Sequence, residues 1–150
     1  MFALWLVLVA LVTLCVAWAY HTAQRLNRLH IRTDSARQSL QAALDRRAAV
    51  VGALLPGAAS ISGAAEAVPL VPERFEQRAA CEQKVSALIA GWEGELPAAV
   101  VDAEARVQLA HRFYNDAVAD TRALRVRPFV RLFYLGGTAR LPEFFEFAAL

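Results

Sequence analysis

The stretch FALWLVLVALVTLCVAWAY, residues 2–20, decides how the chain is organised. Thr13 is its only clearly polar side chain. A helix rises about 1.5 Å per residue, so a helix of this length reaches roughly 28 Å, close to the hydrocarbon thickness of a bilayer. Trp18 and Tyr20 lie at its C-terminal end, and amphipathic rings of this kind favour the headgroup level. The pattern predicts a transmembrane anchor over residues 1–20, with the lipid bilayer as its partner.

A cleavable signal peptide is the main alternative to a retained anchor. Ala17-Trp18-Ala19 resembles a cleavage site with small residues on either side of a larger one. However, no basic segment precedes the apolar run, and the run is longer than that of a typical signal peptide. A buried core helix is rarely apolar on every face. We therefore expect the anchor to be retained.

The charges that flank the anchor predict its orientation. Only the α-amino group precedes it, whereas Arg25, Arg28, Arg32 and Arg37 follow. By the positive-inside rule, the N-terminus lies outside the cell membrane and residues 21–150 lie in the cytoplasm.

Beyond the anchor, apolar residues recur at spacings of three, four and seven, which is typical of one side of a helix. No Gly or Pro occurs before Gly52, so one helix is expected from the membrane to about residue 55. A second long helix is expected to start at Pro72 and to end at Gly91. A third is expected from Pro97 to about residue 127.

The segments between these helices are less regular. Residues 56–72 contain three prolines and two glycines and are expected to form a structured connection, with a short helix over about 58–67 as an option. Residues 128–135 are expected to form one or two further helical turns. Because each long helix has a single apolar side, we predict an all-α fold. In this fold, the N-terminal transmembrane helix continues into an antiparallel three- or four-helix bundle formed by residues 21–150.

Three stretches resemble the LemA family of membrane-anchored helical proteins. LNRLHIRTDSARQSLQAALDRRAAVVGALL (residues 26–55) contains an Arg46-Arg47 pair and resembles the basic first bundle helix of that family. HRFYNDAV (residues 111–118) resembles its YND motif, and LPEFFEF (residues 141–147) resembles its short aromatic and acidic C-terminal piece. The resemblance implies a helical bundle displayed at a bacterial membrane. It implies no reaction, because the biochemical role of the family is not established.

Five residues are candidates for contacts between helices or with a partner: Arg46, Arg47, Tyr114, Asn115 and Asp116. Asn115 and Asp116 lie in the middle of a predicted helix, where neither residue type is favoured. One interpretation is a polar contact site for a partner. The other is that these side chains bond with a neighbouring helix and fix its register.

The second interpretation predicts a cation near Asp116, and its identity depends on the direction of the third helix. If that helix runs away from the membrane, Asp116 lies level with about Arg46 or Arg47. If it runs back, Asp116 lies level with about Arg37.

The segment RALRVRPFVRLFYL, residues 122–135, combines basic and aromatic side chains. Its candidate membrane-surface contacts are Arg125, Arg127, Arg131, Phe129 and Phe133, because such side chains together favour anionic headgroups. The alternative is a solvated arginine face over a packed aromatic face. One short patch on a chain of net charge +2 does not predict nucleic-acid binding.

Motifs for catalysis and metal binding do not occur in the sequence. There is no HExxH, no Cys/His cluster, no GxSxG and no phosphate-binding loop. His21, His30 and His111 are widely separated, and Cys15 and Cys81 are too few and too distant for a disulfide framework. We therefore expect no enzymatic activity, no cofactor, no metal and no small-molecule substrate.

Two functional hypotheses follow. The first is a non-enzymatic, single-pass membrane protein that presents a helical bundle as a scaffold or protein-interaction module to an unknown protein partner. The alternative is a homo-oligomer that self-assembles and shapes the membrane or the cell envelope.

Overall fold

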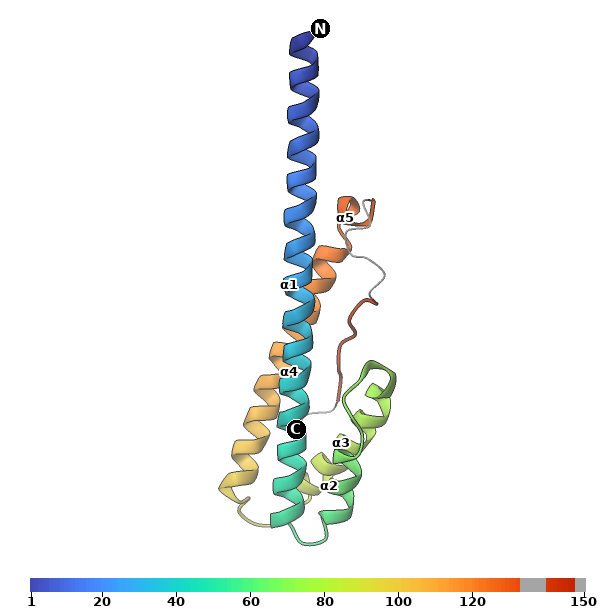
Figure 1. Cartoon of the computed structure of the whole chain (residues 1–150). Coiled ribbons are helices and arrows are strands. Elements are labelled where there is room, and N and C mark those ends of the chain that lie inside the picture. The colour runs from blue at the N-terminus through green and yellow to red at the C-terminus, as the bar shows by residue number, and fades with distance from the viewer. Residues whose placement is uncertain (133–139, 148–150) are drawn as a thin grey trace.

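The computed structural model describes residues 1–132 and 140–147, and all regular structure within this part is helical. This confirms the prediction of an all-α fold (Figure 1). The elements, in chain order, are α1 (Phe2–Leu54), α2 (Ala59–Glu66), the 3-10 turn η1 (Pro72–Arg74), α3 (Phe75–Ala90), α4 (Ala98–Arg125) and α5 (Pro128–Leu132). Each long helix begins and ends within a few residues of the boundaries expected from Pro, Gly and apolar spacing.

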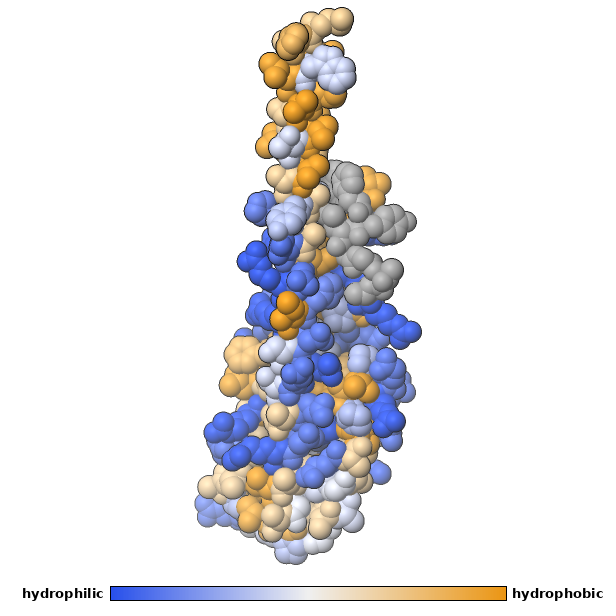
Figure 2. All heavy atoms as spheres, viewed as in Figure 1, coloured by the Kyte–Doolittle hydropathy of each residue, from blue (hydrophilic) through white to orange (hydrophobic). Residues whose placement is uncertain are grey.

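The helix α1 runs unbroken for 53 residues. Its N-terminal part is exposed on every side and is long and apolar enough to cross a membrane. In Figure 2, mostly hydrophobic side chains cover this end, while hydrophilic ones dominate the visible face beyond it. From Leu26 onward, one side of the helix is buried, and Leu40, Leu44 and Val51 are among its fully covered side chains. The helix therefore changes from exposed all round to buried on one stripe, as its sequence predicts.

The helix α4 lies antiparallel against α1. Near one end of the contact, Arg47 of α1 pairs with Glu104 of α4 at 2.7 Å. Near the other end, the hydroxyls of Thr33 and Thr121 lie 3.0 Å apart. Residue numbers therefore rise along α1 as they fall along α4, and the chain returns toward the N-terminal part of α1 (Figure 1).

The connection between α1 and α4 folds back as α2 and α3. Gly52 allows α2 to approach α1 closely, because a Cβ there would come within 3.0 Å of the Cβ of Ser62. Val51 of α1, Val85 of α3 and Val100 of α4 meet in one buried cluster at this end of the structure. The helices α1, α3 and α4 thus share a core that none of them forms alone.

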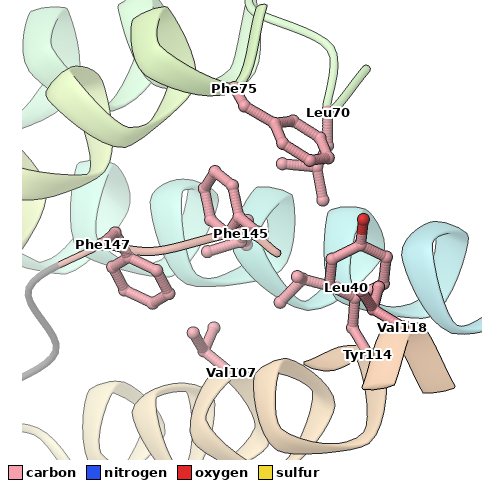
Figure 3. Close-up of a cluster of buried hydrophobic side chains, with 9 residues drawn as sticks. Leu40, Leu70, Phe75, Val107, Tyr114, Val118, Phe145 and Phe147 are labelled. Carbon is pink, nitrogen blue, oxygen red and sulfur yellow. The ribbon is translucent and has the colours of Figure 1, made fainter. Parts of the chain in front are cut away.

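The C-terminal segment, residues 140–147, is extended rather than helical. It lies between α3 and α4 (Figure 3), where Phe145 and Phe147 are buried against Leu40, Phe75 and Val107. The rings of Phe75 and Phe145 meet edge to face with their centroids 5.3 Å apart, a favourable aromatic geometry. In this half of the core, an extended segment therefore takes the place that a further helix occupies in a bundle.

Charged side chains are buried where α1, α3 and α4 meet. Glu82 of α3 accepts a hydrogen bond from Arg47 of α1 at 2.6 Å and another from Arg78, one turn earlier on α3, at 2.7 Å. All three side chains are 0% exposed. Arg47 also donates to Glu104 of α4, and Arg78 donates to Asp45 of α1, both at 2.7 Å. We call these five residues the buried ion network.

The buried ion network constrains how the helices pack. Removing charges from water costs several kcal/mol per ion, and only close partners offset that cost. Glu82 is the residue that both buried guanidinium groups share. The guanidinium of Arg78 also donates to the carbonyl of Val68 at 2.6 Å, which ties the loop after α2 to the network. Any other register of these helices would leave at least one buried charge without a partner.

We expect Glu82→Gln to lower the free energy of unfolding by about 3 kcal/mol, because a buried pair that loses one partner leaves uncompensated charge on the other. The amide would also turn N–H donors toward a guanidinium, which can only donate. Urea unfolding of the full-length protein in mild detergent, followed by helical circular dichroism, measures the change.

Glu93→Gln is the matched control, since Glu93 is exposed after α3 and surface changes stay within about 0.5 kcal/mol. Equal unfolding free energies for the two variants would refute a structural role for the network.

Candidate functional site

The residues of the YND stretch bind the C-terminal segment. The hydroxyl of Tyr114 donates to the carbonyl of Glu143 at 2.6 Å. The side chain of Asn115 contacts both backbone groups of Phe145, accepting from its N–H at 3.2 Å and donating to its carbonyl at 3.4 Å. Nε2 of His111 lies 2.6 Å from the same carbonyl. A carbonyl only accepts, so this arrangement requires a proton on Nε2.

These bonds explain why polar residues stand in the middle of α4. An extended segment that pairs with no strand leaves its N–H and C=O groups without partners, and burial then makes them costly. Asn115 supplies one donor and one acceptor to the backbone of Phe145, much as a neighbouring strand would. One interpretation of the sequence pairs Asn115 with a neighbouring helix, whereas its partner in the structure is the extended segment. Two of the stretches that resemble the LemA family therefore contact each other.

The predicted pairing of Asp116 is wrong. The helix α4 runs back along α1, so Asp116 lies level with about residue 37 rather than with the Arg46-Arg47 pair. Its side chain is exposed and forms no ion pair with any residue in the described ranges. The rotation of α4 about its axis explains this. Tyr114 and Ala117 face the core, so the side chain of Asp116 points to the outer face of the helix.

The two arginines of the Arg46-Arg47 pair have different environments. Arg47 is fully buried in the ion network, and its guanidinium lies 5.5 Å from the ring centroid of Phe147. Arg46 is exposed. It lies near the solvent-exposed Asp102 of α4, whose pKa is lowered mainly by a hydrogen bond from Arg106 and, to a smaller extent, by the charge of Arg46. Consecutive helix positions point about 100° apart, so the two side chains leave α1 in different directions, and packing determines which one is buried.

Four of the five predicted membrane-surface residues lie at the end of α4, in the turn after it or in α5. Arg127 and Arg131 are exposed, and Arg125 is half-buried. Phe129 is part of α5, and Phe133 lies outside the described residues.

A pocket of about 180 Å³ lies between this region and α1. It is lined by Trp18, Thr22 and Arg25 of α1 together with Leu124, Arg127 and Val130. The return of α4 therefore brings part of the basic segment to the level at which the apolar stretch of α1 ends.

A groove of about 530 Å³ lies between α1 and α4, and every residue that lines it comes from these two helices. Ile31 of α1 and Leu109 and Phe113 of α4 line it with side chains that are 61%, 55% and 54% exposed. Sequence periodicity did not find this surface, because these residues lie beside the buried stripes rather than on them. Three exposed apolar side chains gathered in one groove are typical of a binding surface.

The charged residues that line the groove are Arg28, Arg32 and Arg106, with no carboxylate among the lining residues. Arg32 pairs with Asp120 at 3.2 Å, and Arg106 pairs with Asp102 at 2.8 Å. These pairs are exposed, and such pairs contribute only about 0–1 kcal/mol, so a bound partner can replace them. No group of three or more His, Cys, Asp or Glu side chains able to hold a metal occurs in the described part of the chain. The groove thus offers apolar contact and positive charge.

The hydrogen bond from Tyr114 leads to a prediction about pH. Burial raises the pKa of Tyr114 from 10.0 to about 12. Between these pH values, the folded state keeps a proton on Tyr114 that the unfolded state has lost. The contribution of Tyr114 to the free energy of unfolding is therefore fully present below pH 10 and is lost as pH rises through 12. We expect Tyr114→Phe to lower the free energy of unfolding by about 1 kcal/mol at neutral pH. The deficit should shrink above pH 10, because phenylalanine has no proton to lose.

Urea unfolding at several pH values measures both effects, and Tyr20→Phe is the control at an exposed tyrosine. A deficit that stays constant up to pH 12 would show that Tyr114 ionises equally readily in both states.

Comparison with known proteins finds no match among models of protein families, among curated proteins or among solved structures. The resemblance to the LemA family therefore rests on the three quoted stretches alone and stays a prediction.

Proposed function

We propose that this chain is a non-enzymatic, single-pass membrane protein whose residues 21–150 form an antiparallel helical bundle that presents the α1–α4 groove to a partner protein. The groove is the observation that carries the proposal. The continuity of α1 supports it, because one helix holds both the apolar stretch and one wall of the groove. Arg28 follows Tyr20 by two helical turns, so the groove begins about 12 Å beyond the apolar stretch.

The partner that fits this groove is an amphipathic helix with acidic flanks. Two packed helices leave a concave surface between them, and the apolar face of a third helix fills such a surface. Ile31, Leu109 and Phe113 would contact that apolar face. The guanidinium groups along the groove would pair with carboxylates, which arginine binds through two parallel hydrogen bonds. Charge would therefore select the partner, and apolar contact would supply most of the affinity.

Self-assembly through the same groove is less favourable. A symmetric dimer places the same surface patch of both copies in contact. Arg28, Arg32 and Arg106 of one copy would then face the same arginines of the other, and like charges across an interface are costly. The orientation with the helical region in the cytoplasm remains part of the proposal and rests on the arginines that follow the anchor.

A photo-reactive amino acid at position 109 in the membrane of living cells tests the proposal. We expect one discrete heterologous product, and peptide mapping should place the cross-link on an acidic, amphipathic helix of the partner. Phe113→Asp should abolish the product, because it puts a carboxylate among the apolar contacts and loss of a central aromatic contact costs about 2 kcal/mol or more.

Val101→Asp is the matched control. Val101 also lies on α4 and is 53% exposed, close to the 54% of Phe113, but it does not line the groove. A ladder of homo-oligomers would favour self-assembly instead. Loss of the product in both variants, or a product that maps to a basic or extended segment, would contradict the proposed site.

A further inference from the structure

The charges of this chain are divided unevenly along its length. Residues 1–33 and 121–142 contain no Asp or Glu, yet they hold eight of the 16 cationic side chains. The remaining residues hold the other eight cations and all 14 acidic side chains, which gives them a net charge of −6. The eight arginines in the two acid-free stretches are Arg25, Arg28, Arg32, Arg122, Arg125, Arg127, Arg131 and Arg140.

The fold brings the two acid-free stretches together. Leu26 of α1 packs against Leu124 of α4 and Val130 of α5 in one buried cluster. In Figure 1, α5 lies beside α1 and nearer to its N-terminal end than α2 or α3. Described residues of both stretches thus form one surface where the apolar part of α1 ends, and Arg25 and Arg127 lie on it.

The pocket between α1 and α5 is the concave part of this surface. Arg25 enters it from α1, and Arg127 enters it from the turn between α4 and α5. Neither arginine forms an ion pair with a residue in the described ranges, and no carboxylate is among the residues that line the pocket. Its volume of about 180 Å³ is several times the roughly 30 Å³ that one water molecule occupies in the liquid.

The depth of the pocket matches the headgroup layer. Trp18, which lines the pocket, belongs to the apolar stretch, and tryptophan favours the boundary between hydrocarbon and water. Arg25 follows the end of that stretch by five residues, about 7.5 Å along the helix. The headgroup layer is itself about 5–8 Å deep on each side of a bilayer. An arginine at this depth is within reach of lipid phosphates.

We propose that this pocket binds the phosphate of an anionic phospholipid, with Arg25 and Arg127 as the donors. Guanidinium groups bind phosphate oxygens through paired hydrogen bonds, and the two arginines approach from different helical segments. Such a lipid would join α1 to the α4–α5 turn and give the helical region a second attachment to the membrane. It would thereby limit rotation about the anchor and set the direction in which the α1–α4 groove faces.

The experiment uses full-length protein in mild detergent, with Trp5→Phe and Trp92→Phe so that Trp18 is the sole tryptophan and reports on the pocket. Phosphatidylglycerol, phosphatidylcholine and inorganic phosphate are each added to separate samples. We expect phosphatidylglycerol to change the fluorescence of Trp18 saturably, and the other two to have little effect. The double variant Arg25→Gln/Arg127→Gln should weaken phosphatidylglycerol binding roughly thirtyfold, because each arginine near an anionic surface contributes about 1 kcal/mol and the two together contribute about 2 kcal/mol.

The double variant Arg74→Gln/Arg112→Gln removes the same charge from exposed positions outside the acid-free stretches and should bind like the parent protein. Equal responses to phosphatidylcholine and phosphatidylglycerol would overturn the proposal, and so would equal losses in the two double variants. Saturation by inorganic phosphate would identify a site for free anions instead.

This inference rests on the proposed membrane anchor, which is tested separately by alkaline extraction of native membranes. Extraction of the protein would refute the anchor. Retention in the membrane without a response to phosphatidylglycerol would refute the lipid site alone.

Discussion

Two buried guanidinium groups share the carboxylate of Glu82, and the arrangement of α1, α3 and α4 depends on that contact. Apolar side chains tolerate small sliding of one helix against another, whereas buried charges do not, because a lost partner leaves an ion in a medium of low dielectric constant. Arg47 and Arg78 extend the contact to Glu104 and Asp45. This network sets the antiparallel register of α1 and α4, and both candidate binding surfaces follow from that register.

The two surfaces differ in chemistry because they lie at different distances from the apolar stretch. In the proposed anchor arrangement, the pocket beside Trp18 and Arg25 lies at the depth of lipid headgroups. The groove around Phe113 begins farther out and combines exposed apolar side chains with arginines. In the proposed function, the anchor and the lipid site hold and orient the helical region, and the groove binds the partner. Each surface requires residues from both α1 and α4, so neither exists before the two helices pack.

Local sequence patterns were enough to predict the helices and the apolar stretch. Apolar spacing and the prolines at 72 and 97 were enough to place every long helix within a few residues, because helix boundaries depend on local backbone chemistry. The composition of residues 2–20 likewise determined a helix long and apolar enough to span a membrane. The basic and aromatic candidates of residues 122–135 were also visible in sequence, although their distance from the apolar stretch was not.

Which polar residues meet depends on how the helices pack, and local patterns did not predict it. Arg46 and Arg47 are neighbours with similar local chemistry, yet one is exposed and the other fully buried. Asp116 was expected to pair and is exposed, whereas Asn115 beside it binds the extended backbone of Phe145. Nothing in the local sequence indicates that Glu82 is buried, since a carboxylate on a helix usually faces solvent. Partners separated by 30 residues or more depend on the direction and rotation of whole helices, and these depend on packing across the core rather than on local spacing.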